Sequence, residues 1–154
     1  MNACQEQPLG RIIYHTAQDI HYLAEKILQP YDVTVEQMHL LKNLSAEVGM
    51  TQKSLGGMVN KTPANLTRIL DRLEMKSFIV RRPDSGDRRE NLVFLTDRGI
   101  VLVKDVHETF QQFSVRMLLG ISDDMQQMVR SCLKIMGANI EQMTLELKKV
   151  TSEG

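Results

Sequence analysis

Apolar residues recur every three or four positions along most of this chain, which is the period of an amphipathic α-helix. The first such stripe begins at Leu9 and is expected to end before Pro30, because a residue that precedes proline is driven out of the helical region. Thr34 and Gln37 form a capping box, which predicts a second helix running to about Ala46. A third, short helix is expected over residues 51–60.

The middle of the chain predicts a fourth helix followed by a β-hairpin. Thr62 is suited to the N-cap and Pro63 to the first helical position, where the missing amide of proline costs nothing. Leu66, Ile69, Leu70 and Leu73 would then share one face of that helix. Residues 78–82 and 91–95 are typical of two short strands, joined by a turn over residues 83–86.

Two long helices complete the pattern, one after a Thr96 cap and one after a Ser122 cap. The last helix carries a single apolar stripe, which is too long and too one-sided for the surface of a small monomer. We therefore expect it to form an association surface. The stripe consists of Met125, Val129, Cys132, Met136, Ile140, Met143, Leu147 and Val150.

The predicted fold is mainly α: a winged helix-turn-helix with an α/β wing, flanked by N- and C-terminal dimerisation helices. Residues 1–154 are expected to form a single domain. Within it, residues 34–98 would form the winged lobe, and residues 9–29 and 100–150 the dimerisation helices. No internal repeat interrupts this order.

Composition is that of an ordinary globular domain, with 42% hydrophobic and 25% charged residues among 154. The chain has no net charge, but residues 61–99 hold nine Lys or Arg against six Asp or Glu, a local net charge of +3. An anionic partner would dock there. The first ten residues lack the basic flank and apolar run of a signal peptide, and no apolar run approaches the roughly 20 residues of a membrane span, so a cytoplasmic protein without membrane contact is expected.

The predicted arrangement indicates double-stranded DNA as that partner. An α-helix fits the major groove, and a hairpin beside it reaches the neighbouring minor groove. The narrow minor groove concentrates negative potential, which favours arginine at a hairpin tip. This explains why arginines gather around the turn between the two strands, at Arg81, Arg82, Arg88 and Arg89, with a fifth, Arg98, just after the second strand.

These residues resemble the MarR (multiple antibiotic resistance regulator) family of repressors over most of the chain. The motifs that carry the resemblance are Thr67-Arg68, Asp71-Arg72-Leu73-Glu74, Asp87-Arg88-Arg89 and Leu95-Thr96-Asp97-Arg98-Gly99. The resemblance implies a homodimer with separated DNA-binding lobes and a small-molecule or redox input. Two positions depart from the family pattern: Ser77 replaces the usual glycine after the recognition helix, and Gly56 replaces the usual alanine after Leu55.

Site residues follow from the motifs. Arg89 is expected to enter the minor groove, oriented by Asp87, while Arg81, Arg82 and Arg88 would contact phosphates. On the recognition helix Thr62, Pro63, Asn65, Thr67 and Arg68 are expected to reach DNA, Asn65 by pairing with adenine and Arg68 with guanine. Two roles stay open for Arg72: a contact with DNA, or an ion pair with Asp71 or Glu74. The dimerisation residues are expected to be Leu9, Ile13, Ile20, Met136, Ile140, Met143 and Leu147.

The predicted function is a homodimeric repressor of a pseudo-palindromic operator whose half-sites lie about 10 bp apart. A small lipophilic or aromatic effector would modulate its DNA affinity, although no effector site is assigned. The ten methionines suit either an adaptable ligand pocket or a dimer core. An enzyme is not expected, because the chain has no Gly-rich phosphate loop or nucleophile elbow, and no cofactor is implied.

Three other functions remain open at this point. His39 and His107 fall where some relatives sense zinc, but the partner ligands of such a site are absent, so no metal is expected. Cys4 or Cys132 would serve a redox-responsive regulator, although Gly10 stands where the peroxide-sensing branch has its cysteine. A winged-helix protein-interaction module that does not bind DNA is the third.

Overall fold

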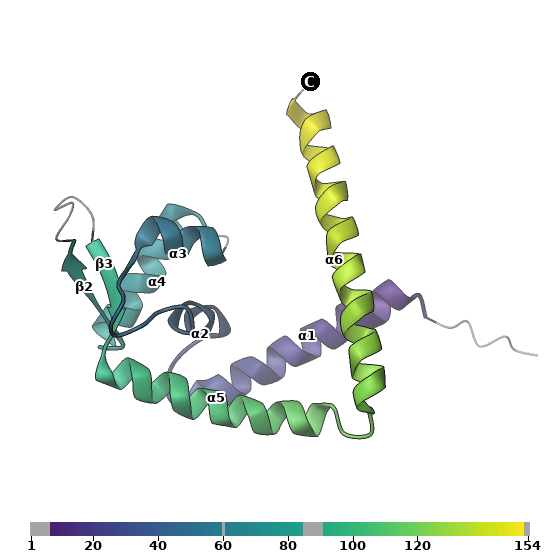
Figure 1. Ribbon diagram of the computed structural model, residues 1–154, viewed down its shortest axis with the longest axis horizontal. Coiled ribbons are helices and arrows are strands. Elements are labelled where there is room, and N and C mark those ends of the chain that lie inside the picture. Colours follow the sequence, from purple (N-terminus) through teal and green to yellow (C-terminus); the bar gives the residue numbers. More distant parts are fainter. Residues whose placement is uncertain (1–6, 60, 85–90, 153–154) are drawn as a thin grey trace, which may run out of the picture. The chain divides into compact units, whose positions relative to one another are not determined.

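The computed structural model describes residues 7–59, 61–84 and 91–152. The chain forms two compact units that divide between Gln111 and Gln112 (Figure 1). The first unit contains α1 (Leu9–Leu28), the 3-10 turn η1 (Gln29–Tyr31), α2 (Val35–Leu41), β1 (Met50–Thr51), α3 (Gln52–Val59), α4 (Pro63–Met75), β2 (Ile79–Pro83), β3 (Asn91–Leu95) and most of α5 (Asp97–Met117). The second contains the end of α5 and α6 (Asp123–Ser152).

The core of the first unit is drawn from nearly all of its helices and strands. Leucines supply most of it, because their unbranched Cβ suits helices and their bulk fills the space between them. The side chains with the least exposure are Leu28, Leu40, Leu41, Leu55, Leu70, Leu73, Ile79, Val93 and Val106. The predicted apolar face of α4 is confirmed: Leu66, Leu70 and Leu73 lie in this core, and Ile69 is partly buried against it.

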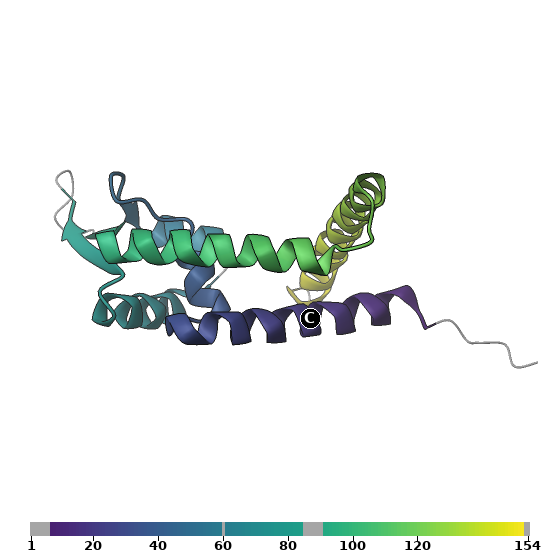
Figure 2. The ribbon, with the colours of Figure 1, turned by 90° about the horizontal axis from the view of Figure 1, so that it is seen from below.

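The sheet has three antiparallel strands in the order β1-β3-β2, which makes β2 an edge strand. Ile79 pairs with Leu95 and Pro83 with Asn91 across the predicted hairpin. The strand β1 was not predicted from the sequence: Met50 and Thr51 pair with Val93 and Leu92. Figure 2 shows β2 and β3 at the end of this unit opposite the N-terminal end of α1.

The four predicted N-caps are confirmed. Thr34 and Gln37 satisfy each other's backbone amides at the start of α2, and Thr62 accepts a hydrogen bond from the backbone of Asn65. Thr96 accepts the amide of Gly99 at 3.0 Å, and Ser122 accepts the amide of Met125 at 3.3 Å.

The predicted end of the second helix was wrong. The helix α2 ends at Leu41 rather than near Ala46, because the chain from Ser45 onward turns toward the sheet. There the carbonyl of Ser45 accepts the backbone amide of Leu95 at 2.9 Å. Leu44 is still buried, but from a non-helical backbone.

Ser77 adopts the left-handed conformation that the family's usual glycine would adopt, with φ of 59°. Its amide bonds the carbonyl of Glu74 at 2.8 Å, and the amide of Phe78 bonds the carbonyl of Leu73 at 3.0 Å. These two bonds are those of a Schellman C-cap. The cap therefore has its usual geometry, but its left-handed residue is a serine and not a glycine.

The helix α6 has 30 residues, and none of its described side chains is buried. Along its predicted stripe Ile140 is 60% exposed, Met143 61% and Leu147 68%, whereas Met136 is half-buried. In α1 the predicted dimerisation residues Leu9 and Ile20 are likewise exposed and Ile13 is half-buried. Among the described helices, none combines the length and apolar character that a bilayer span requires.

Candidate nucleic-acid interface

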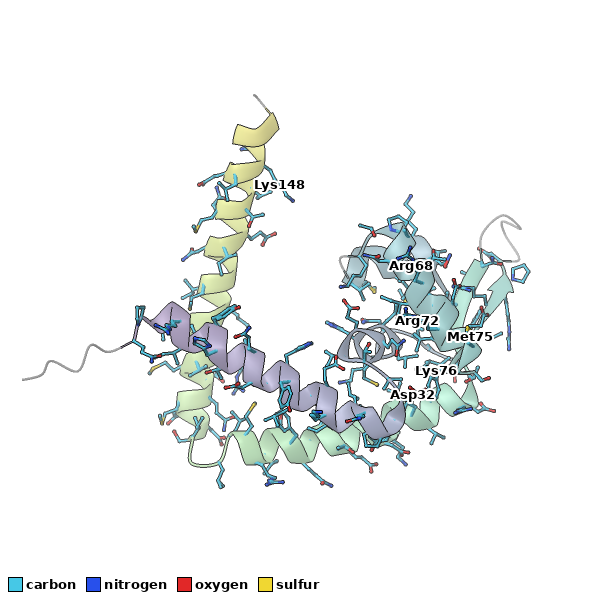
Figure 3. All side chains as sticks on the ribbon, turned by 180° about the vertical axis from the view of Figure 1, so that it is seen from behind. Asp32, Arg68, Arg72, Met75, Lys76 and Lys148 are labelled. Atoms are coloured by element: carbon cyan, nitrogen blue, oxygen red, sulfur yellow. The ribbon has the colours of Figure 1, made fainter. Side chains whose placement is uncertain are left out.

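The helix α4 presents a polar face opposite its buried leucines. Asn65, Thr67, Arg68 and Arg72 are all exposed on it. Its N-terminus is formed by Thr62 and Pro63, both exposed, and the start of a helix is the end that stabilises an anionic ligand. Figure 3 shows Arg68 and Arg72 along this helix.

Two recesses flank α4. Asn65, Arg68 and Arg72 line one of about 270 Å³ together with Lys61, Glu36 and Ile69. Pro63 and Thr67 line the other, of about 440 Å³, which continues over Gln52, Lys53, Gly56 and Gly57 of α3. The structure therefore brings the five predicted α4 residues together along one helix, divided between its two sides.

Lysines at both ends of α4 are paired with acidic residues of the preceding segment. Lys61 pairs with Glu36 of α2. Lys76 lies 3.1 Å from a carboxylate oxygen of Asp32 and also donates to the Asp32 carbonyl (Figure 3). Sequence reasoning missed both lysines, because charges so far apart in the chain carry no local signal of pairing.

The wing carries the remaining predicted residues. Arg82 is exposed, and its guanidinium lies 5.3 Å from the centre of the Phe94 ring, so the aromatic ring supports its position. Asp87, Arg88 and Arg89 lie outside the described residues. Their expected roles in the minor groove and at phosphates stay predictions.

Arg81 differs from the other arginines of the interface. Its side chain is only 18% exposed and its guanidinium contacts Asp71 at 2.7 Å and Glu74 at 2.8 Å. The two carboxylates considered as partners of Arg72 are thus bonded to Arg81 instead. Arg72 is exposed and lines the same recess as Arg68, and its expected contact with DNA stays a prediction.

The metal and redox candidates receive no support from the described residues. No group of three or more His, Cys, Asp or Glu side chains there could hold a metal ion. His107 lies 3.0 Å from the side chain of Gln111, and His39 is exposed. Cys132 is exposed on α6, whereas Cys4 lies outside the described residues.

A helix-turn-helix formed by α3 and α4, next to an antiparallel hairpin, defines this chain as a winged helix-turn-helix protein. The MarR family model matches residues 33–91. The multiple antibiotic resistance protein MarR of Salmonella typhimurium is 35% identical over 101 residues, which span 66% of this chain and 70% of that protein.

Solved structures agree with this match. A mutant of MarR from Escherichia coli, complexed with operator DNA, is 28% identical with a TM-score of 0.75, and the match covers 84% of this chain and 94% of that one. The DNA complex of MepR from Staphylococcus aureus has the same fold, with a TM-score of 0.77 at 24% identity over 88% of this chain and 99% of that one. This chain belongs to the MarR family, whose members are DNA-binding transcriptional regulators and not enzymes.

Proposed function

We propose that this protein is a homodimeric repressor that binds a pseudo-palindromic operator and releases it when a small aromatic or lipophilic effector binds. The observation that supports this most directly is the exposed polar face of α4 beside the wing. Residues 34–98 would serve as the DNA-binding lobe, and residues 9–29 and 100–150 as dimerisation helices.

Direct base readout is assigned to Asn65 and Arg68. Both lie in the first two turns of α4, which is the part of a recognition helix that contacts base edges. Asn65 has the paired donor and acceptor for adenine, and Arg68 the paired donors for guanine. Thr67 donates its hydroxyl to the Pro63 carbonyl at 2.9 Å, so its methyl group is left for apolar contact with a base. Arg82 and Arg88 are assigned to phosphates, and Arg89 to the minor groove.

Association of two copies is supported by α6. The apolar stripe runs from Met125 to Leu147, about 33 Å of helix at 1.5 Å per residue, and is exposed at most of its positions, which is a large surface to leave in water. A two-fold axis would bury the stripe and present two α4 helices about 10 bp apart on one side of the duplex.

The effector is supported by an apolar recess of about 260 Å³ in the first unit. It lies between α1, α2 and α5 and is lined by Leu28, Val35, Met38, His39, Lys42 and Phe110. The ammonium of Lys42 lies 5.5 Å from the centre of the Phe110 ring. A small aromatic ring bearing an acidic group matches this size and the single lysine charge.

The central experiment selects a duplex from a random-sequence pool with the wild-type protein and measures its affinity by gel shift. Arg68→Ala is expected to weaken binding by about 1–3 kcal/mol, and Arg89→Ala by a similar amount, with the dimer intact in sedimentation. Lys104→Ala is the control, because it removes an exposed charge from the same unit outside the interface. Unaltered affinity in both arginine variants would show that this face does not contact the DNA, and failure of the wild type to select any duplex would point to an interaction module that does not bind DNA.

Repression and effector binding have their own tests. Deleting the gene should raise expression from a reporter placed behind the selected duplex, and lower expression would make the protein an activator.

Phenolic and lipophilic compounds are screened by thermal shift and then by displacement of DNA. Met38→Trp, which fills the recess, should abolish the shift, and a shift that persists would exclude this site.

A further inference from the structure

Three hydrogen bonds join the end of α4 to the middle of β2. The Nη1 atom of Arg81 donates to Asp71 at 2.7 Å and to Glu74 at 2.8 Å, and the backbone amide of Arg81 donates to the other oxygen of Glu74 at 3.0 Å. Glu74 therefore holds both the side chain and the backbone of one residue in the wing strand.

The strand geometry explains why Arg81, rather than Arg82, makes these contacts. Alternate side chains point to opposite faces of a strand, so Arg81 shares a face with buried Ile79 and lies opposite buried Val93. Its Nε and Nη2 atoms are buried. A guanidinium turned inward in this way is poorly placed for a phosphate.

The backbone contact follows from the position of β2 at the edge of the sheet. Amides on the outer side of an edge strand have no partner within the sheet and need another acceptor. Glu74 supplies one from the recognition helix itself. The wing strand and α4 are thereby connected through a single carboxylate.

We infer that Arg81, Asp71 and Glu74 form a clamp that sets the wing relative to the recognition helix. Arg81 is then a positioning residue and not a phosphate ligand. The inference rests on the proposed function, in which α4 and the wing engage neighbouring grooves at once. The DNA contacts of α4 and of the wing strengthen each other only when the geometry allows both to form. A displaced wing would therefore lose its contact with the DNA.

The clamp is tested by whether one substitution strengthens or weakens DNA binding. Glu74→Gln removes a negative charge from the DNA-binding unit. If Glu74 only competed with phosphates for Arg81, its loss would tighten DNA binding. The clamp predicts the opposite: affinity for the selected duplex falls about fivefold, while affinity for a scrambled duplex of equal length does not fall, because only the specific complex needs both contacts.

Glu47→Gln is the matched control. It makes the same charge change at an exposed glutamate of the same unit, outside the clamp, and should not weaken binding to the selected duplex. Thermal melting and sedimentation establish that each variant folds and associates as the wild type does. The double variant Arg81→Gln/Glu74→Gln should bind no more weakly than Arg81→Gln alone, because the two residues act as a pair.

The outcomes separate the clamp from the proposed function. Failure of the wild type to bind any duplex refutes the function, and with it the clamp's role in DNA recognition. A wild type that binds, together with a Glu74→Gln variant that binds equally well or better, refutes the clamp alone. Hydrogen exchange adds a readout without DNA: Glu74→Ala, which leaves no side-chain acceptor for this amide, should speed exchange of the Arg81 amide, and unchanged protection would also overturn the clamp.

Discussion

Replacing Ser77 with glycine should stabilise the protein. Ser77 has a φ of 59°, and its side chain is exposed. A left-handed backbone costs a residue with a Cβ about 1–2 kcal/mol, and glycine bears almost none of this cost. The Schellman bonds of this cap involve only backbone atoms, so the substitution preserves them.

The expected gain is smaller than that strain, because glycine also gives the unfolded chain more freedom, at a cost of about 0.4–1 kcal/mol. The net stabilisation is then about 0.5–1 kcal/mol. For a chain of this size each kcal/mol raises the melting temperature by about 2–4 °C, so a rise of about 1–4 °C is expected.

Calorimetry or circular dichroism at one fixed protein concentration measures this change, since association of subunits would make the melting temperature depend on concentration. Ser77→Ala is the control: it removes the hydroxyl but keeps the Cβ, and should give no such rise. A melting temperature for Ser77→Gly at or below that of Ser77→Ala would refute the argument from backbone strain.

Three further substitutions test other features of the structure. Gly99→Ala should destabilise by about 3 kcal/mol or more in denaturant unfolding, because its Cβ would lie 2.1 Å from the Phe78 carbonyl oxygen; full stability would show that this close approach is wrong. Thr34→Ala should cost about 1 kcal/mol by removing the capping box of α2, and Thr34→Ser, which keeps the hydroxyl, should restore most of it. Ile140→Glu should give a monomer in sedimentation at micromolar concentration if α6 forms the dimer, whereas Lys134→Glu, an exposed charge change on the same helix, is the control.

The structure explains why the Leu-Thr-x-x-Gly motif ends in a glycine. Thr96 caps α5 and also donates to the Ser77 carbonyl at 2.7 Å, which brings the start of α5 against the end of α4. Gly99 lies one turn further, directly over the Phe78 carbonyl. The motif was visible in the sequence, but the contact that excludes a side chain joins residues about twenty positions apart.

Local signals in the sequence determined most of the elements. Helix periodicity, the Thr34 and Thr62 caps and the two strand-like segments of the hairpin depend on neighbouring residues, and the mainly helical winged fold followed from their order. Tertiary contacts decided the rest. The two-residue strand β1 is too short to show a period, and α2 ends where the chain turns to pair Ser45 with Leu95. Arg81 and Arg82 are identical neighbours in sequence, yet the strand directs one toward the carboxylates of α4 and the other toward solvent, because adjacent side chains on a strand face opposite ways.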